Sequence, residues 1–168
     1  VLEDELEFFS DEEEIPTIDP AYFEGWSRIE MEDYIFMLRP NFVQEENKNI
    51  WNSPDLKVSV LKDENAQGKT LQQFLVQLTS SDTWNQNTQV TGKILSDTRY
   101  DWNGREMYEH RVRFSDAYVA RWYMMNDFGK IFVAEWRSKN DSEEEANKGF
   151  DEAIGTMSTF EFKKETRD

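Results

Sequence analysis

Hydrophobic positions along this chain recur with two different periods, and the shorter period predicts strands. Apolar or alternating runs at Asp33–Arg39 and Leu56–Leu61 are typical of strands. Five further runs predict an antiparallel meander, at residues 89–95, 98–102, 106–114, 118–125 and 130–137. Phe160 and Phe162 alternate near the end of the chain and predict a short last strand. The stretch 41–54 shows little period, so we expect a loop there.

The longer period predicts two helices. Thr70 and Gln73 fit a capping box, in which a hydroxyl and an amide satisfy free N–H groups at a helix start. Ser142 and Glu145 repeat that pattern before the second helix. Apolar residues at helical spacing follow each start, namely Leu71, Phe74, Leu75 and Leu78 in the first helix and Ala146, Phe150, Ala153, Ile154 and Met157 in the second.

The order of these elements predicts the fold class. Asn103-Gly104 stands between two strand runs and favours a type I′ hairpin turn, because both of its central residues need positive φ. Residues 126–129 predict the next turn. We expect an α+β domain, a twisted antiparallel sheet of about six strands packed by two helices.

Charge divides the chain into an arm and a body. Residues 1–20 hold nine of the 35 acidic residues and none of the 19 basic ones. Like charges at that density resist compaction, so we expect residues 1–20 to be a disordered acidic arm and residues 21–168 to be one domain. The domain should fold without the arm. A net charge of −16 disfavours nucleic acid and anionic membrane surfaces as partners.

Three segments resemble the PsbP-like fold, which photosystem lumenal proteins, DcrB-type bacterial envelope lipoproteins and a nuclear Ran-binding protein share. They read EDYIFMLRPNF at 32–42, LKVSVLKDENAQGKTLQQFLVQL at 56–78 and FDEAIGTMSTFEF at 150–162. The resemblance implies a PsbP-like sandwich, and it carries over no catalytic set. It also implies an accessory or docking subunit of an envelope, periplasmic or lumenal complex. The alternative is a cytoplasmic chaperone or adaptor that holds an apolar segment of a client protein.

Residue chemistry favours binding over catalysis. His110 is the only histidine and falls on an apolar strand face, so we expect a partly buried structural side chain whose polar groups are satisfied. The chain lacks cysteine, and the stretch Asp63–Gly68 resembles a calcium loop without its final bidentate glutamate. We therefore expect no metal, no cofactor and no enzymatic activity. The start at Val1 is compatible with a removed signal peptide and equally with a trimmed chain.

The meander carries the first set of candidate partner-binding residues. Residues 99–137 hold six arginines and one lysine, and arginine suits bidentate contacts with carboxylates. Arg111, Arg113 and Arg121 are the candidates for a sheet face that binds an acidic segment, either the chain's own arm or a partner. The alternative is a solvated face with cross-strand ion pairs to Glu109 and Glu135.

Aromatic residues in polar surroundings are the second set of candidates. Trp51 and Trp84 lie in the stretches NKNIWNSP and SSDTWNQN, which predicts that they are exposed in loops. Phe8 and Phe9 interrupt the acidic arm and would give it an apolar anchor on a partner. The sequence identifies neither the partner nor the oligomeric state.

Overall fold

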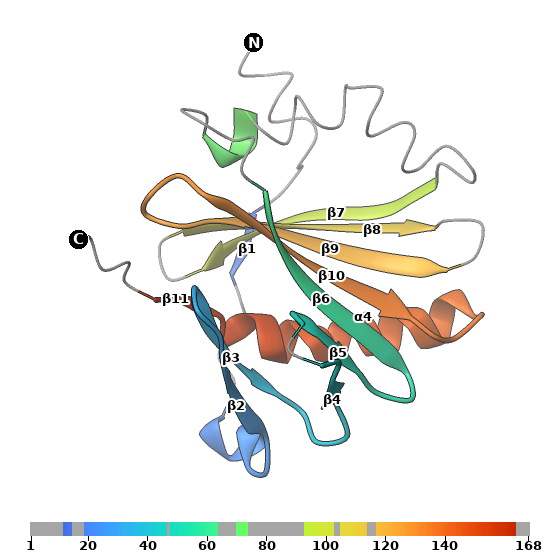
Figure 1. The fold of residues 1–168 in the computed structure, drawn as a ribbon. Coiled ribbons are helices and arrows are strands. Elements are labelled where there is room, and N and C mark those ends of the chain that lie inside the picture. Colours follow the sequence, from blue (N-terminus) through green and yellow to red (C-terminus); the bar gives the residue numbers. More distant parts are fainter. Residues whose placement is uncertain are drawn as a thin grey trace.

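The computed structural model describes residues 12–14, 19–46, 48–63, 70–73, 93–102, 105–113 and 117–163. These residues form a large sheet, a small sheet and a long helix, which confirms the α+β class. The helix, α4, crosses one face of the large sheet, and the small sheet lies beside it (Figure 1). Helical elements are η1 (Pro20–Phe23), a turn at Leu71–Gln73 and α4 (Glu143–Ser158).

The large sheet has eight strands in the order β1-β7-β8-β9-β10-β6-β5-β4. All neighbouring pairs are antiparallel except β1 and β7, which run parallel. The strands are β1 (Glu12–Glu14), β4 (Val43–Gln44), β5 (Ile50–Asn52), β6 (Leu56–Asp63), β7 (Lys93–Trp102), β8 (Arg105–Arg113), β9 (Tyr118–Met125) and β10 (Ile131–Ser138).

Both faces of the central strands of this sheet are buried. On β9, Ala120 and Trp122 point into the main core beneath α4, whereas Val119 and Tyr123 point to the opposite face and pack in smaller clusters. This explains why β9 reads as a nearly continuous apolar run, since a strand that is covered on one side only would alternate.

Helix α4 confirms the prediction for residues 142–157. The Ser142 hydroxyl accepts a hydrogen bond from the Glu145 N–H at 3.4 Å, and three glutamates occupy the first turn, where the positive end of the helix dipole favours them. Its buried stripe packs on the large sheet and consists mainly of Ala146, Phe150, Ala153 and Met157.

The small sheet has the order β11-β3-β2, with β2 (Ser27–Glu30), β3 (Tyr34–Leu38) and β11 (Glu161–Phe162). Alternate β3 residues Tyr34, Phe36 and Leu38 are buried in the main core. The rings of Tyr34 and Phe160 stack at 5.1 Å, and Phe132 of the large sheet meets Tyr34 edge-on at 6.1 Å. Aromatic packing therefore joins the two sheets.

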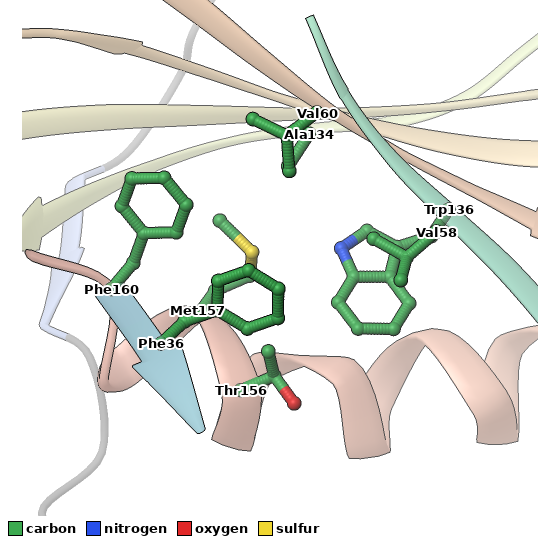
Figure 2. A pocket seen from close by; sticks show the side chains of 8 residues that line it. All are labelled: Phe36, Val58, Val60, Ala134, Trp136, Thr156, Met157 and Phe160. Atoms are coloured by element: carbon green, nitrogen blue, oxygen red, sulfur yellow. The ribbon is translucent and has the colours of Figure 1, made fainter. Parts of the chain in front are cut away.

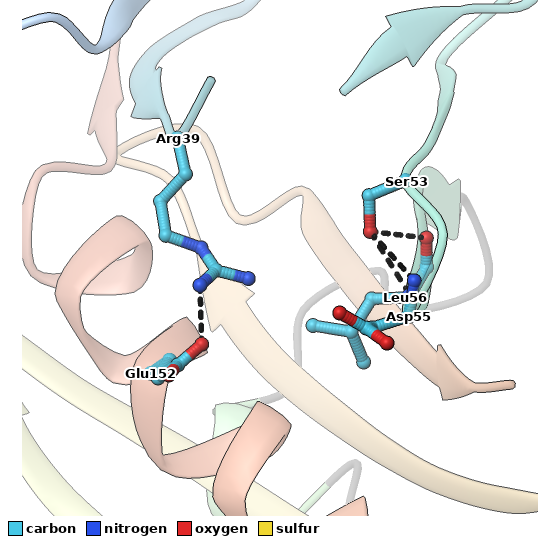
Figure 3. A network of polar contacts seen from close by, with 5 residues as sticks. All are labelled: Arg39, Ser53, Asp55, Leu56 and Glu152. Carbon is cyan, nitrogen blue, oxygen red and sulfur yellow. Dashed lines mark hydrogen bonds and ion pairs between the residues drawn. The ribbon is translucent and has the colours of Figure 1, made fainter. Parts of the chain in front are cut away.

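Polar contacts hold the connections in place (Figure 3). Arg39, which follows β3, forms an ion pair with Glu152 of α4. The Ser53 hydroxyl accepts hydrogen bonds from the N–H groups of Asp55 and Leu56 at 3.2 and 3.0 Å. The Lys139 ammonium donates to the Ser53 carbonyl at 2.6 Å. The hydrogen bonds of Ser53 and Lys139 hold the turn between β5 and β6 against the end of β10.

The sheet architecture is larger than the sequence predicts. A single sheet of about six strands is wrong, because the strands divide into sheets of eight and three. The expected loop at 41–54 contains β4 and β5, which extend the large sheet beyond β6. The strands expected at 89–95 and 98–102 join in β7, with a register shift between Ile94 and Ser96, and residues 89–92 lie outside the described residues.

The first predicted helix is confirmed at its start. Both hydrogen bonds of the capping box are present. The Thr70 N–H donates to the Gln73 amide oxygen at 3.0 Å, and the Gln73 N–H donates to the Thr70 hydroxyl at 3.1 Å. The rest of that helix lies outside the described residues, as does Asn103-Gly104. The pairing of Trp102 with Arg105 on either side of that dipeptide is antiparallel, as a hairpin requires.

The acidic arm contains regular structure where none was expected. Glu12–Glu14 pair in parallel with Arg99–Asp101 of β7, so that part of the disorder prediction is wrong. The physical reason is that β7 is otherwise the last strand of the sheet, and an edge strand offers unpaired N–H and C=O groups to any extended segment nearby. Residues 1–11 and 15–18 lie outside the described residues.

Candidate functional site

The Arg111 side chain forms hydrogen bonds within the domain that join β8 of the large sheet to α4. Its guanidinium donates to Glu109 at 3.1 Å, and to Asn147 and Asp151 of α4 at 3.1 and 2.9 Å. It also lies over the ring of Phe150. Only 11% of its side chain is exposed, because α4 covers it. Arg111 therefore stabilises the contact between β8 and α4.

Glu109 is the buried member of this cluster, with 1% of its side chain exposed. Burial disfavours the carboxylate and raises the pKa of Glu109 to about 7, although the neighbouring Arg111 opposes the rise. The packing of α4 on β8 therefore depends on a carboxyl group that titrates near neutral pH.

The three candidate arginines do not share a face. In the antiparallel register Arg111 stands opposite Ala120, and Arg121 stands opposite His110. Arg111 and Arg113 are thus on the α4 face and Arg121 is on the other face, so the single basic face predicted from the sequence is wrong. Arg121 instead pairs across the strands with Glu135 at 3.1 Å, which is the alternative interpretation. Arg113 bonds the Tyr118 hydroxyl and lies over its ring at 4.7 Å.

Of the aromatic candidates for partner binding, Trp51 is the one that the structure describes. Trp51 is 2% exposed, on β5, and meets Phe36 edge-on at 5.2 Å, so the prediction of an exposed loop residue is wrong. Trp84, Phe8 and Phe9 lie outside the described residues. His110 is fully buried, which exceeds the partial burial expected from the sequence, and burial together with the charge of Arg121 lowers the pKa of His110 to about 4.

A pocket in the main core is lined by side chains of α4, β3, β6 and β10, together with Phe160 (Figure 2). Met157, Phe36 and Phe160 close one side, while Val58, Val60 and Ala134 close the sheet side. Its polar groups are the Thr156 hydroxyl and the Trp136 indole. This is a packing gap of the core, and it offers no ionisable group to a reactant.

An aromatic cluster of Tyr22, Phe23 and Trp26 lies outside the core clusters. Their ring centroids are 4.9–5.4 Å apart, and Tyr22 is 47% exposed. Phe23 and Trp26 are partly exposed. Rings of this size in mutual contact at the surface form an apolar patch, and such patches commonly bind other molecules.

Local sequence explains why this aromatic cluster is ordered. The Asp19 carboxylate accepts a hydrogen bond from the Ala21 N–H at 2.9 Å, and Pro20 supplies a helical φ at the first position of η1. Gly25 has a φ of +82°, which lets the chain reverse. The Trp26 N–H then donates to the Phe23 carbonyl at 3.0 Å, which brings the two rings together.

The aromatic cluster leads directly into β2, the outer strand of the small sheet. The Lys163 N–H donates to the Asp33 carbonyl, and the Met37 N–H donates to the Thr159 hydroxyl. The main-chain N–H and C=O groups of the odd-numbered residues of β3 therefore point towards β11. The main-chain groups of the even-numbered residues of β3 point towards β2, where Leu38 pairs with Ser27 and Phe36 pairs with Ile29. The main-chain groups of Arg28 and Glu30 consequently point outwards, and no strand among the described residues pairs with them.

Acidic residues outnumber basic ones in the segment that contains β2. Residues 19–33 contain Arg28 as their only basic residue, and it lies 3.5 Å from Glu30. The acidic residues of the same stretch are Asp19, Glu24, Glu30, Glu32 and Asp33. The sequence contained a signal for this site, namely three aromatic residues within PAYFEGW before the first strong strand, but nothing in it showed that β2 is a strand with an open edge.

The described residues contain no group of three or more His, Asp or Glu residues that could hold a metal ion. None of their helices has the length and apolar character needed to cross a membrane.

Comparison with known proteins gives no family. No family model matches the chain, and no curated protein matches it. Among solved structures it is similar to PA94 from Pseudomonas aeruginosa, a protein of unknown function, with a TM-score of 0.49 and 9% sequence identity over 78% of this chain and 94% of that one.

Proposed function

We propose that this chain is a non-enzymatic accessory or docking subunit that binds a protein partner. The observation that supports this most is the aromatic cluster Tyr22–Phe23–Trp26 beside the open edge of β2. Partly exposed aromatic rings next to unpaired main-chain groups suit protein recognition, because rings supply apolar area and the edge supplies directed hydrogen bonds.

The finer interpretation of the fold and setting also belongs to this proposal. We also propose a PsbP-like sandwich as the finer fold class and an envelope, periplasmic or lumenal complex as the setting, and the meander that runs into α4 and a short last strand supports this proposal. A cytoplasmic chaperone that holds an apolar client segment is the alternative. The exposed ring of Tyr22 is compatible with both, and the identity of the bound protein separates them.

Site-specific cross-linking tests the proposal. Tyr22 is replaced by a photoreactive phenylalanine derivative in the full chain, which is then irradiated in native extract. A matched variant carries the same group at Leu61, an exposed apolar position on β6 that is 58% exposed. We expect a discrete cross-linked protein from position 22 and none from position 61. Equal labelling from both positions, or no discrete product from position 22, would contradict the proposal.

A further inference from the structure

We infer that the open edge of β2 binds an extended basic segment of a partner protein, which adds a strand to the small sheet and places one large apolar side chain on the aromatic cluster Tyr22–Phe23–Trp26. This inference rests on the proposed function and gives the partner its chemistry. Three properties of one surface support it: the outward main-chain groups of β2, the aromatic cluster that precedes β2 in the sequence, and the charged side chains near this strand.

Main-chain geometry sets the first requirement, an extended partner. Arg28 and Glu30 direct their N–H and C=O groups away from β3, since Ser27 and Ile29 are the residues paired with it. An edge of this kind accepts another strand through main-chain hydrogen bonds, while pockets for alternate side chains add specificity.

The aromatic cluster sets the second requirement, a large apolar side chain. It stands at the start of β2, because Trp26 directly precedes Ser27. The positive φ of Gly25 and the hydrogen bond from Trp26 to Phe23 hold the rings before any partner arrives. Binding therefore orders few side chains, which favours an anchor at this end of the added strand.

Charge sets the third requirement, basic residues in the partner. Arg28 is 3.5 Å from Glu30, and Lys163 approaches the same carboxylate at 3.7 Å, while the side chains of Glu24 and Glu32 are exposed near the two ends of the strand. These five side chains carry three negative and two positive charges, so the excess negative charge favours a basic segment over an acidic one. A second copy of this chain would bring its own charge of −16 to the surface.

A synthetic probe tests these requirements on the full chain. The probe is a seven-residue peptide that alternates Lys with Val, Phe and Val, and binding is followed by tryptophan fluorescence at low salt. One control peptide has Glu in place of every Lys. A second keeps the lysines and the Phe but has Pro in place of both Val residues, so it matches the charge and lacks two of the main-chain N–H donors that an added strand would use. We expect the first peptide to bind at least about tenfold more tightly than either control.

Variants of the chain localise the binding. Arg28→Pro removes an outward N–H and leaves the bonds of Ser27 and Ile29 to β3, so it should weaken binding by about tenfold or more without unfolding the sheet. Tyr22→Ala removes the exposed ring and should weaken binding by about three- to tenfold. Leu61→Ser removes an exposed apolar side chain elsewhere and should leave binding unchanged. Thermal unfolding of each variant checks that it is folded.

Hydrogen exchange supplies a readout that depends on the edge itself. The bound peptide should slow exchange at the amides of Arg28 and Glu30 and leave β10 unchanged. Equal binding of the Pro-containing peptide, or of Arg28→Pro, would overturn the inference, and so would a dimer of the chain that Arg28→Pro dissociates. If the probe fails while Tyr22 still cross-links a discrete protein, the basic-strand inference is wrong and the proposed binding function stands. If both fail, the surface has neither role.

Discussion

The two sheets of this domain use their surfaces in different ways. The central strands of the large sheet are buried on both faces, with α4 and the small sheet on one side and the cluster around Tyr123 and Ile131 on the other. The small sheet buries Tyr34, Phe36 and Leu38 in the same core, and no strand among the described residues pairs with the outer edge of β2. Both sheets therefore contribute to the core, whereas the outer edge of β2 lies away from it.

The aromatic contact between the two sheets should contribute the most to the stability of the domain. Phe132 is buried on β10 and its ring meets both Tyr34 and Phe162. We expect Phe132→Ala to lower the free energy of unfolding by about 3–5 kcal/mol, because it removes buried area and leaves a cavity. Urea unfolding measures this.

Phe128 provides the matched control for that substitution. It lies in the turn before β10, and 39% of its surface is exposed. Phe128→Ala should cost less than about 1 kcal/mol, because little apolar area is lost. Equal losses from the two substitutions would show that the sheets do not depend on each other for stability.

The next largest effect concerns the polar cluster between β8 and α4. Arg111→Met leaves Glu109 buried without its ion pair, which should cost about 3 kcal/mol at pH 8.5. The loss should shrink at pH 5.5, where Glu109 is protonated and needs no cation. Chemical denaturation at the two pH values measures both quantities.

Arg28→Met is the control for Arg111→Met. Arg28 forms an ion pair with Glu30 in which both side chains are largely exposed. Such pairs are worth about 0–1 kcal/mol, so this substitution should change stability little at either pH. A pH-independent loss in Arg111→Met would mean that its packing on Phe150 matters more than its charge.

The pH dependence of stability isolates Glu109 itself. Its pKa rises from 4.5 in the unfolded chain to about 7 in the fold, so the folded state holds the proton more tightly. This contribution to stability is fully present below pH 4.5 and is lost as the pH rises through 7. Between pH 5.5 and 8.5 the loss from this group is about 2 kcal/mol.

Glu109→Gln removes that titration. Relative to the wild-type chain, the variant should gain about 2 kcal/mol in unfolding free energy between pH 5.5 and 8.5. The comparison of the two chains cancels the other titrating groups. An equal pH profile for both would show that Glu109 stays ionised in the fold.

The smallest expected effect comes from the acidic arm. Among the described residues of the arm, Glu12–Glu14 pair with β7, and Glu14 stands beside Asp101 in register. We expect a chain that starts at Asp19 to melt within about 4 °C of the full chain, which corresponds to roughly 1 kcal/mol at this size. A decrease beyond about 8 °C would show that the arm is part of the domain.

Local signals in the sequence predicted helices and turns well. Ser142 and Thr70 start helices because a hydroxyl three residues before a free N–H is a local arrangement, independent of the rest of the fold. The turn at residues 126–129 is local in the same sense, since the Asn126 side chain accepts from the N–H groups of Phe128 and Lys130.

Long-range pairing decided what the sequence could not show. The strands β4 and β5 have two and three residues, which is too short to show a period in the sequence, and they form because β5 pairs with the edge of β6 and β4 then pairs with β5. Trp51 packs against Phe36, a residue of the other sheet, although Lys48, Asn49, Asn52 and Ser53 near it in the sequence are polar. Burial of this kind follows from tertiary contacts and not from the surrounding residues.

The face of each arginine was the least predictable feature of the candidate site. Alternation within β8 and within β9 is visible in the sequence, but the register that relates the two strands is not. Because Arg111 pairs with Ala120, odd-numbered residues of β8 share a face with even-numbered residues of β9. A register shifted by one residue would have placed Arg111 and Arg121 on the same face.

The strand order of the large sheet also bears on the speed of folding. The hairpins from β7 to β10 join neighbours in the sequence, whereas β10 pairs with β6 across a long intervening segment, Asp63 with Ile131. Closing a long loop costs conformational entropy before the contact is made, so non-local strand pairs tend to form late. We expect the β7–β10 meander to assemble first and β6, with β5 and β4, to be added in a slower step. A destabilising change in β6, such as Val58→Ala, should then accelerate unfolding more than it slows refolding.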